Sequence, residues 1–345
     1  MKRRHSSLLS VTAVLLLLVL LLFGVQRLLV PKYQTVSEEG ALPREYYEET
    51  TTHDVLFLGD CEVFSNFSPV TLWNEYGIPS YIRGGAQQLV WHSYYTLKDT
   101  LKTETPKVVV YNVLALKYGE PQSEAYNRLN LDGLRLSKNK LDAVKASKME
   151  DEDTLSYVFP LLRYHARWSI LTEEDITYYF RQEPVSHNGY LMRVETVPLT
   201  TLPTPPTLSD PNLPETSMAY LERMATLCAE NGITLVLVKS PSVYPHWYDS
   251  WDVEIQTFAQ EHGLSYYNLL ARSDEIGIDL STDTCDMGQH LNVFGAEKLT
   301  LWFGKELKTQ FSLPNRQGEE PFASVWTEKT NHYEKEKARL LAALE

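Results

Sequence analysis

The stretch "DVLFLGDCEVFSNFSP", residues 54–69, joins an apolar run to an acidic turn and then to a helix-start signal. Residues 54–59 are predicted to form a fully buried strand, because the run is continuous in apolar residues and is bounded by Asp and Gly. Cys61 follows this strand directly. It is either a small core residue, as free cysteines usually are, or a nucleophile presented at the strand end.

Strand and helix signals alternate along the rest of the chain. Ser68 as N-cap, Pro69 at the first helical position and Gly77 as stop predict a helix over 69–76. The strand and helix patterns that follow lie at 79–85, 86–102, 106–116, 218–232, 233–242, 251–263 and 264–270, before a last helix that ends near 307. This alternation predicts a three-layer α/β/α fold with a central parallel sheet.

The chain divides into one large domain with additions. Residues 54–312 carry the α/β pattern, interrupted at about 117–215 by a longer, mostly helical insertion. Its aromatic cluster "VFPLLRYHARW", residues 158–168, is expected to be core, with the polar ends of Arg163, His165 and Arg167 reaching the surface. Residues 313–345 are a polar tail that ends in a charged helix.

The N-terminus has the composition of a membrane anchor. Residues 1–7 are basic, and 8–30 contain an uncharged run close to the roughly 20 residues that span a bilayer. A cleaved signal peptide is the alternative, but it would have a shorter apolar region and small residues at the cut. We therefore expect a single-pass anchor with a cytoplasmic N-terminus and an extracytoplasmic domain, joined by a polar linker over 31–53.

The charge distribution disfavours anionic partners and fits a neutral or cationic partner better. All 45 acidic residues follow residue 30, whereas 28 of the 32 basic residues do, so this part has a net charge of −17. Such a body is not expected to bind nucleic acid. The cysteines Cys61, Cys228 and Cys285 are too few for a disulfide framework and have no zinc-type spacing. No metal or cofactor is expected.

Several polar residues fall at the carboxyl ends of the predicted strands, where ligands bind in open parallel sheets. Cys61 follows the first strand, Gly84 and Gly85 the second, and Asn112 lies toward the end of the third. Asp286 and His290 lie in the loop before the last helix of the sheet domain. A cysteine nucleophile needs a base within hydrogen-bond reach, and the base needs an orienting carboxylate.

These blocks resemble the SGNH (GDSL-like) hydrolase superfamily, over about residues 54–310. The matching segments are "LFLGDCE", "RGGAQQL", "VVVYN" and "DMGQHLNVFGAEKLT". The resemblance is greatest to the membrane-anchored extracellular branch, which includes the lipoteichoic-acid D-alanylation protein and alginate-type O-acetyltransferases. It implies an SGNH/flavodoxin-like fold, and transfer or hydrolysis of an acyl ester on a cell-envelope polysaccharide or teichoic-acid-like acceptor. It also implies a membrane-bound O-acyltransferase as partner.

The resemblance assigns roles residue by residue. Cys61 stands where the family has a serine nucleophile, His290 is the base and Asp286 orients it, with Asp283 as a second candidate for that role. Gly85 and Asn112 would form the oxyanion hole. A nearby His290 is expected to lower the pKa of the Cys61 thiol. Weaker candidates line the cleft in this interpretation: Glu62, Arg163, Tyr244 and Trp247.

Two alternatives remain open from the sequence. A disulfide between Cys61 and Cys285 would block the thiolate, because Cys285 abuts Asp286 and so would lie close to Cys61 at the predicted site. The second alternative is that the domain is a catalytically inactive scaffold, or a glycan-binding component of a membrane acylation complex.

Overall fold

The computed structural model describes residues 2–32, 40–181 and 184–345. Within these residues the centre is a five-stranded sheet of β1 (Val55–Gly59), β2 (Ser80–Gly84), β3 (Val108–Asn112), β4 (Thr234–Lys239) and β5 (Ser265–Asn268). The strands lie in the order β2-β1-β3-β4-β5, and all neighbouring pairs are parallel. The predicted α/β architecture with a parallel sheet is confirmed, and all carboxyl ends of the strands meet at one edge.

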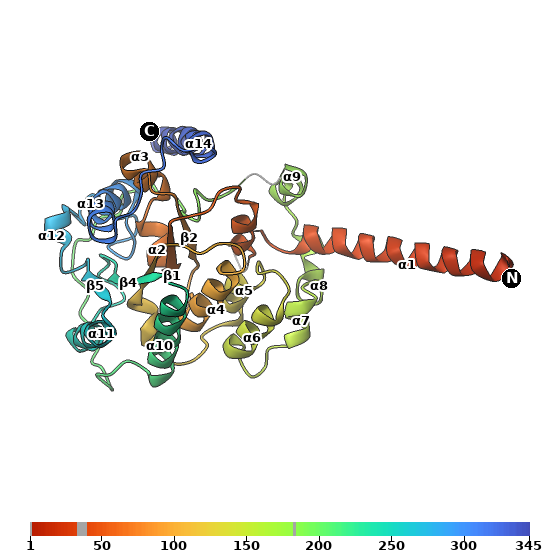
Figure 1. The fold of residues 1–345 in the computed structure, drawn as a ribbon, viewed down its shortest axis with the longest axis horizontal. Coiled ribbons are helices and arrows are strands. Elements are labelled where there is room, and N and C mark those ends of the chain that lie inside the picture. Colours follow the sequence, from red (N-terminus) through yellow and green to blue (C-terminus); the bar gives the residue numbers. More distant parts are fainter. Residues whose placement is uncertain (1, 33–39, 182–183) are drawn as a thin grey trace.

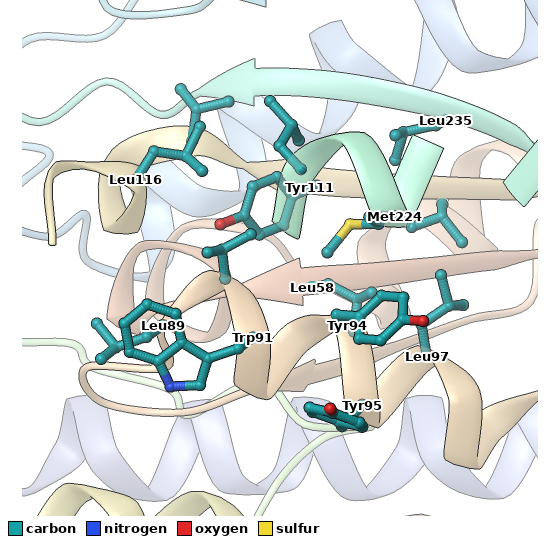
Figure 2. Packing of buried hydrophobic residues seen from close by; sticks show 14 of the residues in the cluster. Leu58, Leu89, Trp91, Tyr94, Tyr95, Leu97, Tyr111, Leu116, Met224 and Leu235 are labelled. Atoms are coloured by element: carbon teal, nitrogen blue, oxygen red, sulfur yellow. The ribbon is translucent and has the colours of Figure 1, made fainter. Parts of the chain in front are cut away.

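Helices cover both faces of the sheet (Figure 1). On one face, α4 (Val90–Thr100), α10 (Glu215–Glu230) and α11 (Asp249–His262) pack on a cluster that contains Leu56 and Leu58 of β1. Figure 2 shows part of this layer, with Trp91 and Tyr94 of α4 and Met224 of α10 around Tyr111 of β3. Because successive strand side chains point to opposite faces, Val55 and Phe57 of β1 enter the second cluster.

The second face is covered by α3 (Pro69–Tyr76), α12 (Ser273–Ile276), α13 (Val293–Phe311) and α14 (Phe322–Ala342). The predicted ends of α3 are correct: the Ser68 side chain accepts a hydrogen bond from the Thr71 N–H, and Gly77 ends the helix in a left-handed conformation. The C-terminal helix α14 packs on this chain. The rings of Trp73 and Trp326 stack with centroids 5.1 Å apart.

Two elements differ from the prediction near the strand ends. β3 ends at Asn112 and continues as the 3-10 helix η2 (Val113–Lys117), so the strand is shorter than expected. A further short helix, α2 (Cys61–Asn66), follows β1 and was not predicted. Its N-cap is Asp60, whose side chain accepts a hydrogen bond from the Glu62 N–H. Cys61 is therefore the first residue of a helix rather than part of a loop.

The segment predicted as a linker is only partly one. Residues 33–39 lie outside the described residues, but 40–53 pack on the domain and contain the 3-10 helix η1 (Leu42–Glu48). Tyr46 is buried against Tyr81 of β2, with ring centroids 5.2 Å apart. His53 is buried between Glu49 and Glu104, with ring nitrogens 3.3 Å and 3.0 Å from their carboxylates. The domain thus begins about a dozen residues earlier than the sequence indicated.

The N-terminal helix α1 (Lys2–Leu29) projects from the domain (Figure 1). Its segment Val11–Leu29 is long and apolar enough to cross a membrane, and only the end of this segment, at Leu29, is buried against the domain. A membrane anchor and a signal sequence both fit these properties.

The insertion, expected to be mostly helical, is helical only up to Arg181, where it packs beside α4, and residues 184–214 contain no helix. It contains α5 (Glu124–Leu131), α6 (Lys138–Ser147), α7 (Thr154–Val158), α8 (Leu161–Tyr164), the 3-10 helix η3 (His165–Ser169) and α9 (Glu173–Arg181). The expectation that 158–168 forms core is wrong for most of its apolar side chains. Tyr164 is buried, but Phe159, Leu162 and Trp168 are exposed. The segment lies beside the end of α1 rather than over the sheet.

Candidate functional site

A cleft of about 400 Å³ opens at the carboxyl edge of the sheet. Residues after β1, after β2, after β3 and after β4 line it, together with parts of the insertion and of the loop before α13. Among its lining residues are Cys61, Glu62, Tyr244, Asp286 and His290. The structure therefore brings together five of the residues that the sequence singled out.

Cys61 lies at the floor of this cleft as the first residue of α2. It is partly exposed and is a free thiol. Burial, with the neighbouring carboxylates of Asp60 and Glu62, raises the pKa of this thiol well above its ordinary value. The expectation of a lowered pKa is therefore wrong, because these effects outweigh the nearby cation Lys117. At neutral pH the group is a thiol, so nucleophilic attack requires a base.

His290 and Asp286, which also line the cleft, form a close pair. The Nδ1 atom of His290 lies 2.5 Å from Oδ2 of Asp286, and the His290 backbone N–H donates to Oδ1 at 2.7 Å. Burial alone would raise the pKa of Asp286, but the hydrogen bonds and charge of His290 outweigh it and hold that pKa below its ordinary value. This pairing leaves Nε2 as the ring nitrogen that does not contact the carboxylate. No hydrogen bond joins His290 to Cys61 among those found for the described residues.

The second candidate for the orienting carboxylate has a different partner. Asp283 is buried and lies 2.7 Å from the Nζ atom of Lys298. The contact with the imidazole therefore belongs to Asp286. Cys285 is also a free thiol in this structure, and its Sγ lies 3.7 Å from the carbonyl oxygens of His290 and Leu291. A disulfide between Cys61 and Cys285 is not present.

A buried polar network supports the cleft floor. The Glu62 carboxylate lies 3.0 Å from Nζ of Lys239 at the end of β4, and both side chains are almost fully buried. Asn112 donates to Glu62 at 2.8 Å and to Asp60 at 3.1 Å, and its oxygen accepts from the Ser240 N–H at 3.0 Å. The network joins the ends of β1, β3 and β4 and so holds α2 in place.

The two groups assigned to the oxyanion hole are already engaged. Both hydrogen bonds of the Asn112 amide group go to carboxylates, and Asn112 is fully buried. The Gly85 N–H donates to the Gly59 carbonyl at 3.3 Å. A Cβ at Gly85 would lie 2.2 Å from Oδ1 of Asn130, so close packing explains this glycine. In this structure neither group offers a free donor to the cleft.

The turn after Gly85 offers other donors. Ala86 and Gln87 line the cleft, and their backbone N–H groups donate none of the hydrogen bonds found among the described residues. Gln87 has φ of +46°, a conformation that is uncommon for a residue other than glycine and that often occurs at functional sites. The segment "RGGAQQL" was singled out from the sequence, but nothing in the residue types marked Ala86 and Gln87, because the φ of Gln87 is set only when the chain is folded.

Two cations in the cleft were also missed. Lys117 at the end of η2 and Arg193 in the insertion line the cleft, whereas Arg163 and Trp247 are not among its described lining residues. Arg163 pairs with Glu124 at 3.6 Å, and Trp247 is buried and donates to Asp252 at 3.1 Å. Lys117 and Arg193 carry no motif, and only the fold brings them beside Cys61 and His290.

Comparison with known proteins adds no relative: no family model matches the chain, and no curated protein matches it. Among the described residues, no cluster of three or more His, Cys, Asp or Glu side chains has an arrangement that could hold a metal ion. The groups that line the cleft and could take part in a reaction are a thiol, a histidine–carboxylate pair, two backbone N–H groups and two cations.

Proposed function

We propose that the protein is a membrane-anchored acyltransferase or esterase that forms an acyl-thioester on Cys61 and acts on a cell-envelope glycopolymer. One observation carries this proposal. Cys61 and the His290–Asp286 pair come from segments more than two hundred residues apart in the chain, yet their side chains line the same cleft. A thiol, a base and a carboxylate that orients the base are the parts that nucleophilic acyl transfer requires.

The chemistry runs in two steps. Nε2 of His290 takes the proton of the Cys61 thiol as the sulfur attacks the carbonyl carbon of the donor ester. The tetrahedral intermediate collapses to a thioester, and His290 returns the proton to the departing alkoxide. A hydroxyl of the acceptor, or water in the hydrolytic reaction, then gives its proton to His290 and attacks the thioester. The Cys61 thiolate leaves and recovers that proton, which restores the starting state.

The oxyanion of each intermediate needs donors that are in place before it forms. Ala86 and Gln87 line the cleft, and no hydrogen bond donated by their N–H groups is found among the described residues, so we assign them this role in place of Gly85 and Asn112.

The cleft cations favour an anionic substrate. Lys117 and Arg193 both line the cleft, although the part of the chain after residue 30 has a net negative charge. A teichoic-acid-like phosphate or an acidic sugar would be attracted by these two side chains. The helix α1, as an anchor with a cytoplasmic N-terminus, would hold the cleft near such a polymer and near a membrane-bound acyltransferase that supplies the acyl group.

Substitution of the nucleophile tests the proposal. The reduced full-length protein in detergent is mixed with p-nitrophenyl acetate, and intact mass is followed with time. We expect one acetyl adduct on the wild-type chain and none on Cys61→Ala. Cys228→Ala is the matched control and should keep the adduct, because Cys228 is buried in α10 and is not among the residues that line the cleft. An adduct that persists in Cys61→Ala would contradict the proposal.

Asp286→Asn tests the orientation of the base. The amide oxygen can still accept the His290 backbone N–H, but the NH₂ group then faces Nδ1. Nδ1 becomes an acceptor, the ring proton moves to Nε2, and Nε2 no longer accepts the thiol proton. We expect acetylation of Cys61 to slow by about 10²- to 10⁴-fold, as loss of a positioned base does.

The pH dependence of stability provides an independent measurement on the same variant. The pKa of Asp286 in the folded chain lies below its ordinary value of 3.8, so its contribution to stability is present above that pH. It is lost as the pH falls through the lowered pKa. Asp286→Asn should therefore lose less stability than wild type during acid unfolding.

In the acetylation experiment, equal rates for wild type and Asp286→Asn would show that Asp286 does not orient the base.

A catalytically inactive, glycan-binding role is the second candidate, and the raised pKa of Cys61 favours it. The two candidates differ in the acetylation experiment. A wild-type chain whose Cys61 is reduced but gains no acetyl group would support the binding role.

A further inference from the structure

Exposed apolar side chains gather on the insertion beside α1. Phe159, Leu162, Trp168, Ile170 and Phe180 are 55%, 52%, 73%, 66% and 77% exposed. Single exposed apolar residues are ordinary on protein surfaces, but a group of large ones marks an interaction site. They belong to α8, η3 and α9 or to the residues between α7 and α9, and α8, η3 and α9 contact α1. We name this segment, residues 154–181, the collar.

The collar is firmly attached to the end of α1. The Arg167 guanidinium donates to the Leu29 carbonyl at 2.6 Å. Leu29 and Val30 are buried in a small cluster with Tyr164. Figure 1 shows α8 and α9 at the domain end of α1. A helix removed as a signal sequence would take part of this packing with it, so these contacts favour a retained anchor.

The contacts also give the depth of the collar along α1. A Cβ at Gly24 would lie 3.3 Å from the Tyr179 hydroxyl oxygen, and the Arg27 guanidinium lies 5.8 Å from the Tyr179 ring centre. Gly24 precedes Leu29, the end of the apolar segment, by five residues. At 1.5 Å per residue this is about 7 Å along the helix. α9 therefore lies beside the last turns of the segment that would cross the membrane.

We propose that the collar lies in the membrane interface around α1, with its exposed apolar side chains in the lipid. Interfacial segments enter the boundary between headgroups and acyl chains by about 5–10 Å, which is the depth that α1 gives to α9. Tryptophan favours this boundary because its ring is amphipathic. Ile176 and Phe180, four residues apart, share one face of α9, while Asp175 pairs with Arg167 at 3.0 Å. The proposal rests on the anchoring part of the proposed function.

A collar in the lipid has a consequence for the cleft. The same insertion supplies Tyr126 of α5 to the cleft lining, and α5 connects through α6 to α7 by direct packing. A collar seated in the interface would therefore fix the height and orientation of the cleft above the bilayer, whereas α1 alone would leave the domain free to rotate.

Tryptophan quenching tests the proposal. The full-length chain is placed in nanodiscs of phosphatidylcholine brominated on the acyl chain near the glycerol, and fluorescence is compared with that in unbrominated nanodiscs. None of the seven tryptophans precedes Trp73, and Trp168 is the most exposed. We expect brominated lipid to quench part of the emission, and Trp168→Phe to abolish this quenching. Trp302→Phe, a partly exposed tryptophan of α13, is the matched control and should leave the quenching unchanged.

Each other outcome overturns the proposal in a distinguishable way. A chain that co-elutes with the nanodiscs but shows no quenching that depends on Trp168 would leave the anchor intact and exclude the lipid contact, as expected if a membrane protein covers the collar instead. A chain that does not co-elute with the nanodiscs would overturn both the anchor and the collar. Acetylation of Cys61 in the same samples reports on the proposed chemistry separately.

Discussion

His290→Ala is expected to slow acetylation of Cys61 by about 10²- to 10⁴-fold, the range that a positioned general base contributes. The reason is the state of the nucleophile. Burial, Asp60 and Glu62 raise the pKa of the Cys61 thiol well above its ordinary value, so very little thiolate exists at neutral pH. Without His290, only the small fraction of Cys61 that is ionised at equilibrium can attack the ester. The rate of adduct formation in the intact-mass experiment measures the effect.

The pH profile of acetylation shows whether His290→Ala slows the reaction through loss of the base or through a change in structure. In His290→Ala the acetylation rate should rise about tenfold per pH unit up to the raised pKa of Cys61, because the rate follows the thiolate fraction. Added imidazole should restore part of the rate at neutral pH. His262→Ala, which removes a histidine of α11 paired with Glu222 outside the cleft, is the control and should react as wild type. An unchanged rate in His290→Ala would exclude it as the base.

Lys239→Met is expected to lower the free energy of unfolding by about 3–5 kcal/mol, the cost of leaving one partner of a buried ion pair without compensation. Lys239 and Glu62 have almost no exposed side-chain surface, and their charged atoms lie 3.0 Å apart. The Lys239 ammonium also donates to the Ser240 carbonyl at 2.6 Å and to the Ser242 hydroxyl at 3.0 Å. Its loss would leave the Glu62 carboxylate with only Asn112 and Ser242. Thermal and denaturant unfolding of the detergent-solubilised chain measure the effect.

Two variants control this measurement. Lys138→Met removes the same side chain from a surface pair with Asp142, where the lysine is 87% exposed, and no measurable effect is expected. The double variant Glu62→Gln with Lys239→Met removes both charges of this ion pair, so it should recover most of the lost stability. A Lys239→Met chain as stable as wild type would show that Glu62 is not buried as a charged group.

Much of the fold follows from local signals. The run at 54–59 forms a buried strand because its side chains can only be apolar on both faces of a covered parallel sheet. α3 begins and ends at Ser68 and Gly77 because a side-chain cap and a left-handed stop act within a few residues. Such signals are read within one segment, which is why the strands of the sheet were placed correctly.

The supporting parts of the site depend on distant segments. Glu62 looked like a cleft residue, but its partner Lys239 lies 177 positions away and is reached only when β1 and β4 end at the same edge. Asn112 follows a valine-rich strand as an oxyanion donor would, yet two buried carboxylates require its amide hydrogens. Ala86 and Gln87 lie in the segment "RGGAQQL", but their residue types do not mark them as hydrogen-bond donors of the cleft.

The sequence by itself determined the α/β pattern, the apolar N-terminal helix and five residues that line the cleft: Cys61, Glu62, Tyr244, Asp286 and His290. Only the tertiary structure decided the surroundings and the partners of these residues. It set the raised pKa of Cys61, the choice of Asp286 over Asp283, and the exposure of Trp168 beside α1. The physical reason is that burial, charge compensation and exposure are properties of neighbours in space. Residue order alone does not specify those neighbours.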